Sequence, residues 1–259
     1  MLRVYPCESA VSKVRFFPGR AAPGVESCRS MKPADIAALL APFLGPETLT
    51  SRQLGQASTY LDLLLKWNAR INLTSVRPPE EIVTRHFGES FFTARHLFPS
   101  PVVIPSERDR ADAKERESRE LRFLSLIDLG SGAGFPGLPI KIYAPWLSVT
   151  LIESQNKKAT FLRETLRALT FTNIDVFSGR AEDYRGGAAG VVTLRAVEQH
   201  QRALAAAARL VSPGGRLALL LGASQIKDAR GLLPGFSWDP PLPLPASSAR
   251  VLLVGMGNR

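Results

Sequence analysis

The 259-residue sequence has few of the residues that form disulfides or hold metal ions. Its two cysteines, Cys7 and Cys28, both lie in the first thirty residues. The rest of the chain therefore has no disulfide framework and no cysteine-based metal site. The three histidines, His86, His96 and His200, do not have the spacing of a zinc-binding helix, and we expect no metal ion.

Long apolar runs are also absent from the sequence. No run reaches the roughly 18 residues that a membrane helix needs. The best candidate, residues 203–221, is interrupted by the turn sequence Ser212-Pro213-Gly214-Gly215. We therefore expect a cytoplasmic protein that does not interact with a membrane.

Acidic residues are outnumbered by basic ones, with 23 aspartates and glutamates against 33 lysines and arginines. The resulting formal charge of +10 indicates a polyanionic partner, of which nucleic acid is the most common.

Four regions of the chain differ in composition. Residues 1–30 contain scattered proline, glycine and serine without a periodic pattern, which predicts a disordered extension before a natural start at Met31. A basic arm that contacts RNA is the alternative. Residues 31–104 form the second region. Residues 105–122 carry mixed charges and predict an exposed linker or insert, with a nucleic-acid contact as the alternative. Residues 123–259 form the fourth region.

Residues 31–104 predict a helical cap. Tyr60, Leu61, Leu64 and Leu65 recur at steps of three and four residues, which is the pattern of an amphipathic helix. A further helix begins at Pro79, whose missing N–H is tolerated in the first turn.

Residues 123–259 predict an α/β domain. Apolar runs of five to seven residues alternate with helical stretches at 156–170, 199–211 and 224–233. This alternation predicts a mostly parallel sheet with helices on both faces. The last run follows a proline-rich segment and has no helix after it, so we expect a final antiparallel strand.

The stretch LIDLGSGAGFPGLPI, residues 126–140, predicts a binding loop. The first strand is expected at Phe123–Leu129 and the first helix from Leu138 onward. Between them lie four glycines, which let a ligand and a helix approach the backbone closely. They are Gly130, Gly132, Gly134 and Gly137.

The loop alone does not distinguish between nucleotide ligands, because Gly132–Gly137 matches the G-x-G-x-x-G pattern of dinucleotide-binding loops. Glu153 ends the second strand at a suitable distance to bind a ribose. Pro136 and Pro139, however, leave fewer N–H groups for a pyrophosphate. The glycine pattern keeps a nicotinamide oxidoreductase as an alternative, although the two prolines argue against it.

S-adenosylmethionine fits these residues better, because it carries a ribose, an adenine and an amino acid but no phosphate. We expect Asp128 near its ammonium group and Glu153 at both ribose hydroxyls. Ala181 and Glu182, in the segment GRAEDY, are expected beside the adenine.

The sequence resembles the bacterial glucose-inhibited division protein B family, which methylates N7 of a guanine in small-subunit ribosomal RNA. The resemblance covers about residues 54 to 225 and rests on LLLKWNARINLTSV, TRHFGESF, GSGAGFPGLP, FLRETLRAL, GRAEDY and TLRAV. Three features differ from the family pattern: the insert at 105–122 is long, Glu89 stands where an aspartate is expected before Ser90, and the tail after residue 225 is only loosely similar.

The resemblance implies a Rossmann-like class I methyltransferase fold with a mostly parallel seven-stranded sheet. It also implies S-adenosyl-L-methionine as cofactor and 16S rRNA or the small ribosomal subunit as partner, and we expect a monomer. The cofactor positions that it implies are Gly130, Phe135, Glu153, Ser154, Gln155, Ala181, Glu182 and Arg195, with Asp128, Gly132 and Gly134 as further loop candidates.

Guanine N7 has a free lone pair, so the implied reaction needs alignment but no general base. Arg195, at the end of the fourth strand, is the candidate for aligning the substrate, with Glu182 or an RNA phosphate as its partner. Asn72, Thr74, Arg85 and His86 are the candidate RNA-binding residues. A second group, on one helix, is either a solvated face or an RNA track: Lys157, Lys158, Arg163 and Arg167. A methyltransferase that acts on a protein or a small molecule is the other alternative.

Overall fold

The computed structural model describes residues 31–98, 125–195 and 200–258. The expectations for residues 1–30 and for the insert at 105–122 concern parts of the chain outside these ranges.

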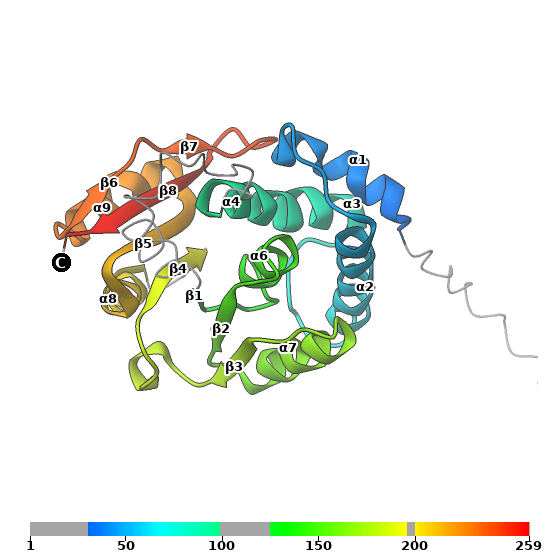
Figure 1. Ribbon diagram of the computed structural model, residues 1–259, viewed down its shortest axis with the longest axis horizontal. Coiled ribbons are helices and arrows are strands. Elements are labelled where there is room, and N and C mark those ends of the chain that lie inside the picture. Colours follow the sequence, from blue (N-terminus) through cyan, green and yellow to red (C-terminus); the bar gives the residue numbers. More distant parts are fainter. Residues whose placement is uncertain (1–30, 99–124, 196–199, 259) are drawn as a thin grey trace, which may run out of the picture.

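A single sheet has the strand order β3-β2-β1-β4-β5-β8-β6, with β7 also paired to β8 (Figure 1). Five strands run parallel to one another, as the alternating sequence pattern predicts. They are β1 (Ser125–Leu129), β2 (Ser148–Glu153), β3 (Ile174–Ser178), β4 (Ala189–Arg195) and β5 (Val211–Gly222).

The antiparallel end of the sheet is centred on β8 (Arg250–Gly257), which pairs with β5 on one side. The short strands β6 (Phe236–Trp238) and β7 (Leu242–Pro243) pair with successive parts of its other edge. The expected final antiparallel strand is thus confirmed, but the sheet has eight strands where seven were expected. The difference is β7, which Pro243 keeps short because proline has no N–H to extend the ladder.

The cap consists of α1 (Pro33–Leu44), α2 (Ser51–Asn68), α3 (Pro79–Ile82), the π-helical η1 (Val83–Gly88) and α4 (Glu89–Leu97). The helices between the strands are α6 (Gly137–Tyr143), α7 (Asn156–Ala168), α8 (His200–Leu210) and α9 (Ile226–Leu232), with 3-10 turns η3 (Ala181–Asp183) and η4 (Ala223–Gln225). None of the helices in the described ranges is long and apolar enough to cross a membrane.

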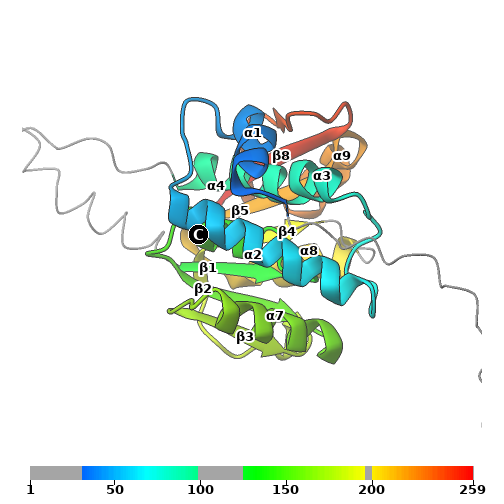
Figure 2. The ribbon, with the colours of Figure 1, turned by 90° about the vertical axis from the view of Figure 1, so that its right-hand side faces the viewer.

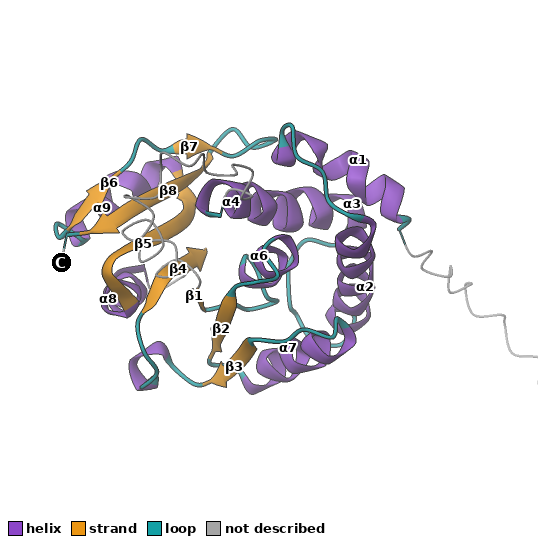
Figure 3. Ribbon diagram, in the orientation of Figure 1, coloured by secondary structure: helices purple, strands orange, loops and turns teal. Residues whose placement is uncertain are grey.

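Alternating side chains of each strand cover the two faces of the sheet. Leu126, Val149 and Val191 join one core, which also contains buried apolar residues of the cap, α6 and α7. Ile127 and Val192 join the other core, with α8 and α9. Figure 3 shows α6 and α7 on one side of the strands and α8 on the other. Helices on both faces are therefore confirmed.

The cap and the sheet share the first core. Helix α2 packs against α6 and α7, and α4 packs against α6. In both Figure 1 and Figure 2, α2 lies alongside α7. Tyr60 of α2, Phe87 of η1 and Phe161 of α7 are fully buried in the core that the cap and the sheet share. The cap thus reaches the carboxyl ends of the strands, where open parallel sheets bind their ligands.

Candidate functional site

The glycine loop between β1 and α6 has the close packing that its sequence predicts. Gly132 has a φ of 58°, and a Cβ placed there would have no neighbour nearer than the Gly130 carbonyl oxygen at 3.8 Å. At Gly137 a Cβ would lie 2.6 Å from Leu151 Cδ2 and 2.8 Å from Asp128 Oδ2. Gly137 thus lets the helix pack on the strands, and Gly132 lies beside open space.

The N–H groups of this loop are largely used within the protein. Those of Gly130 and Ser131 donate to the Ile152 carbonyl, and that of Gly132 donates to the Glu153 carboxylate. Those of Gly134 and Phe135 donate to the Ser131 carbonyl, and that of Gly137 donates to Asp128. The loop is therefore not a cradle of free donors for a pyrophosphate.

Asp128 lies beneath the loop and is fully buried. Its Oδ2 accepts from the Gly137 N–H at 3.1 Å, and its Oδ1 accepts from the Thr193 hydroxyl at 2.8 Å. Burial raises the pKa of Asp128 to about 6, although the Thr193 bond opposes the shift. The expected contact between Asp128 and a ligand ammonium group does not fit this position. Instead, the carboxylate joins β1, β4 and the start of α6.

Glu153 lies at the carboxyl end of β2 with its carboxylate turned toward the loop. Its Oε2 accepts from the Gly132 N–H at 2.8 Å, and its Oε1 accepts from the Gln155 N–H at 2.7 Å. Each oxygen has a second lone pair that can accept from a hydroxyl group. Ser154 and Gln155 follow on the surface. This geometry suits an acceptor for ribose hydroxyls.

Ala181 and Glu182 form the short η3 turn after β3. Glu153 is the last residue of β2 and pairs with Ser178, the last residue of β3. The η3 turn therefore comes shortly after the carboxyl end of the strand next to Glu153. Ala181 is half-buried, and its carbonyl accepts from Arg209 Nη2 at 3.0 Å. Glu182 is exposed.

Residues of the cap also contact the glycine loop. The Tyr60 hydroxyl donates a hydrogen bond to the Ala133 carbonyl. The Phe135 ring centroid lies 5.2 Å from those of Tyr60 and Phe87 and 5.0 Å from that of His86. Phe135, which the resemblance gives as a cofactor residue, is therefore buried mainly against the cap.

Arg195 joins the sheet to the cap at the carboxyl end of β4. Its Nη2 lies 2.8 Å from the Arg85 carbonyl oxygen, 2.9 Å from His86 Nδ1 and 2.9 Å from Glu89 Oε2, and these three acceptors share its two hydrogens. Burial lowers the pKa of Arg195 to about 10, so the guanidinium is still charged at neutral pH. The expectation that Arg195 pairs with Glu182 is wrong, because its ion pair is with Glu89.

His86 and Thr74 form the inner part of the predicted RNA-binding group. His86 Nε2 lies 2.7 Å from the Thr74 hydroxyl oxygen, which also accepts from the Val76 N–H. Burial, together with the nearby charge of Arg195, lowers the pKa of His86 to about 2. His86 is therefore neutral, and because its Nδ1 accepts from Arg195, the ring proton is on Nε2.

Arg85 and Asn72 are the outer part of this group. The Arg85 side chain is 49% exposed and forms an ion pair with Glu81 at 3.1 Å. Asn72 is exposed, and its Oδ1 accepts from Arg77 Nη2 at 3.0 Å. His86 and Thr74 therefore lie inward, whereas the side chains of Arg85 and Asn72 lie at the surface, although the Arg85 carbonyl also contacts Arg195. On α7, three of the four predicted basic residues are exposed and Lys158 is half-buried.

Three residues at this site were missed by the sequence reasoning. Tyr60 follows the apolar period of its helix, so its hydroxyl contact with the loop had no separate signal. Glu89 stood out only as an unusual acid before Ser90. Arg250, whose Nη2 lies 3.1 Å from Glu89 Oε2, belongs to the last strand, where the resemblance is weak.

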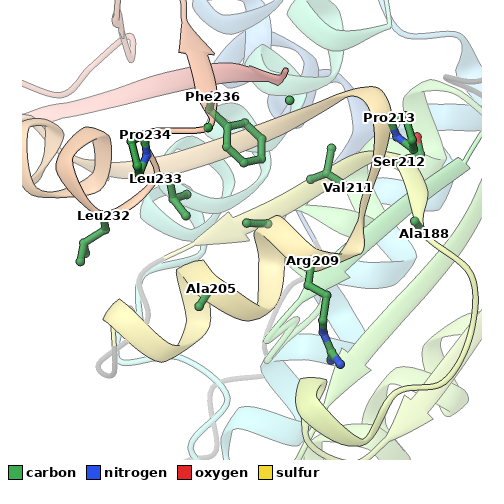
Figure 4. Close-up of a pocket in the computed structure, with 13 residues that line it drawn as sticks. Ala188, Ala205, Arg209, Val211, Ser212, Pro213, Leu232, Leu233, Pro234 and Phe236 are labelled. Carbon is green, nitrogen blue, oxygen red and sulfur yellow. The ribbon is translucent and has the colours of Figure 1, made fainter. Parts of the chain in front are cut away.

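A cavity of about 690 Å³ lies outside this site (Figure 4). It is lined by Ala188 before β4, Val211 at the start of β5 and Phe236 of β6. Ala188 and Val211 lie at the amino ends of β4 and β5, whereas Glu153 and Arg195 lie at the carboxyl ends of β2 and β4. The cavity therefore has no part in the candidate site.

The family described as rRNA small subunit methyltransferase G matches residues 53–102 and 113–232. Ribosomal RNA small subunit methyltransferase G of Xanthomonas campestris pv. campestris is 35% identical over 205 residues, covering 79% of this chain and 85% of that protein. The protein of the same name from Streptococcus thermophilus is 33% identical over 193 residues, covering 71% and 73%. The chain therefore belongs to the rRNA small subunit methyltransferase G family.

Proposed function

We propose that this protein transfers the methyl group of S-adenosylmethionine to N7 of a guanine in 16S ribosomal RNA. The observation that carries the proposal is the contact of Arg195 with Arg85, His86 and Glu89 at the edge of the sheet where the glycine loop lies. This contact connects a surface suited to the cofactor with a surface suited to RNA.

The residues at the sheet edge fit the cofactor. Gly132 borders open space that a side chain would reduce, and Glu153 presents acceptors for the ribose. The N–H groups of the loop are engaged by the protein, which favours a ligand without phosphate over a dinucleotide. We assign the cofactor to Gly130, Gly132, Gly134, Phe135, Glu153, Ser154, Gln155, Ala181, Glu182 and Arg195. Asp128 supports the loop from below.

The reaction needs alignment more than proton transfer. When bound, S-adenosylmethionine supplies a methyl group on a sulfonium, and guanine N7 attacks it with its own lone pair. No proton leaves N7, so no general base is required. The neutral state of His86 is consistent with a role in orienting Arg195 through Nδ1. Arg195 then aligns the substrate beside the cofactor, which is a contribution of proximity.

The RNA is proposed to approach over the cap. Arg85 and Asn72 are exposed there, and Thr74 and His86 lie inward of them. The formal charge of +10 favours a polyanionic substrate over a protein or small molecule. The substrate is either free 16S rRNA or a small-subunit particle. The proposal also includes a monomeric enzyme that works in the cytoplasm.

The proposal is tested by calorimetry followed by a transfer assay. We expect S-adenosylhomocysteine to bind and NADH not to bind. With labelled S-adenosylmethionine, the label should enter small-subunit rRNA, supplied either free or in particles, as N7-methylguanosine. Binding of NADH alone, or label confined to protein or small molecules, would contradict the proposal.

A further inference from the structure

One carboxylate oxygen is shared by two arginines from distant parts of the chain. Glu89 Oε2 lies 2.9 Å from Arg195 Nη2 and 3.1 Å from Arg250 Nη2. Glu89 begins α4, Arg195 ends β4 and Arg250 begins β8. The three side chains thus join the cap, the middle of the sheet and its antiparallel end.

The three side chains are largely shielded from water, which strengthens the attraction between their charges. The Glu89 side chain is 2% exposed, that of Arg195 is 8% exposed and that of Arg250 is 21% exposed. Burial raises the pKa of Glu89, and both arginines oppose that shift. A single carboxylate in this setting is a strong acceptor for both guanidinium groups.

We infer that Glu89 and Arg250 are positioning residues for Arg195. This inference rests on the function proposed above. The other two acceptors of Arg195 Nη2, the Arg85 carbonyl and His86 Nδ1, are neutral, so Glu89 is the charged one. Arg250 holds Glu89 from the side of β8. The last strand thereby sets where the Arg195 guanidinium lies over the Phe135 ring, whose centroid is 6.0 Å from Cζ.

The Arg250 side chain is not required to anchor its own strand. Its N–H donates to the Ser247 hydroxyl and its carbonyl accepts from the Leu244 N–H. Arg250 also pairs with Gly222 in the β5–β8 ladder. Replacing the side chain with methionine keeps these backbone bonds and much of the apolar stem. The Arg250→Met variant should therefore fold, and what it removes is the support of Glu89.

The test is a double-mutant cycle between Arg250→Met and Arg195→Lys. We expect Arg250→Met alone to slow single-turnover methyl transfer about tenfold, roughly 1.4 kcal/mol. In the Arg195→Lys background, the same change should alter the rate less than twofold, because the group that it positions is already gone. Glu89→Asp, which keeps the carboxylate, should retain more activity than Glu89→Gln.

Arg230→Met is the matched control, because Arg230 is an exposed arginine that donates to the Asp239 carbonyl, away from the site. It should leave the rate unchanged. The Arg195 guanidinium resonance, observed by NMR, gives a readout that does not depend on activity. Its rotation should be faster in Arg250→Met than in the wild type, because Glu89 is held less firmly, and unchanged in Arg230→Met.

The outcomes separate the two claims. A tenfold loss that persists in the Arg195→Lys background would make Arg250 a merely structural residue and would overturn the inference. Unchanged rotation of Arg195 in Arg250→Met would do the same, even in a protein that bound no cofactor. A wild-type protein that failed to bind S-adenosylhomocysteine would instead contradict the proposed function.

Discussion

The hydroxyl of Tyr60 in the helical cap donates a hydrogen bond to the carbonyl of Ala133 in the glycine loop. Tyr60 is fully buried, and its ring stacks on Phe135 at 5.2 Å between centroids. The cap is therefore part of the binding loop's support, in addition to providing a surface for the substrate.

We predict that Tyr60→Phe weakens the binding of S-adenosylhomocysteine several-fold. The change leaves the buried Ala133 carbonyl without its donor, which costs about 1–3 kcal/mol of stability and loosens the loop. Calorimetry and thermal unfolding measure the two effects. Tyr143→Phe is the control, because it removes a hydrogen bond to Glu47 away from the loop. It should lower stability without lowering affinity, and equal affinities in both variants would contradict the role of Tyr60.

The loop itself and the sheet could be predicted from the sequence, because their signals are local. Apolar runs separated by helical stretches give parallel strands, and four glycines after the first run give the turn. The direction of the Asp128 side chain could not be predicted from its neighbours. It shares the sheet face of Leu126, and Gly137 and Thr193 come close enough to bond it only after folding.

The cluster around Arg195 could not be predicted because it depends on long-range packing. Arg195 and Glu89 are 106 residues apart, and the contact exists only because the cap packs over the ends of the strands. The sequence indicated that an arginine at the end of an apolar strand needs a partner. It could not distinguish Glu89 from Glu182, which is closer in the chain but lies exposed in η3.

At Gly132, alanine should weaken cofactor binding by tenfold or more, roughly 1.4 kcal/mol. The φ of 58° strains any side chain there, and the added methyl group enters the open space beside the loop. Gly55→Ala, in α2, places its Cβ where nothing lies within 4 Å and should leave binding unchanged. If Gly132→Ala folds and binds the cofactor as wild type does, the loop is not the cofactor site.

Lysine in place of Arg195 should give a folded protein that keeps part of its cofactor affinity and loses most of its methyl transfer. Lysine keeps the charge beside Glu89 but lacks the planar fork that can make parallel hydrogen bonds. Single-turnover rates on rRNA, measured beside calorimetry with S-adenosylhomocysteine, distinguish the two effects. A wild-type rate would remove Arg195 from the proposed site.

His86 should stay neutral down to mildly acidic pH in the folded protein. Its pKa is lowered to about 2, below the ordinary 6.5, so the stability from its burial is present above pH 6.5. That stability is lost as the pH falls, since the unfolded chain takes up the proton. Imidazole nitrogen shifts measured by NMR should therefore show the Nε2–H form of His86 at pH 5, and a midpoint near 6.5 would contradict its contact with Arg195.

The raised pKa of Asp128, about 6, has the opposite effect on the free energy of unfolding. Its contribution to stability is present below about pH 4 and is lost as the pH rises through about 6.

The most direct test of the proposed function is to map N7-methylguanosine in the 16S rRNA of cells with and without the gene, and again after adding back the wild-type or Arg195→Lys protein. One guanine should carry the modification only when the gene is present. The wild-type protein should restore the modification, and Arg195→Lys should restore little of it. An identical modification pattern in both kinds of cell would contradict the account.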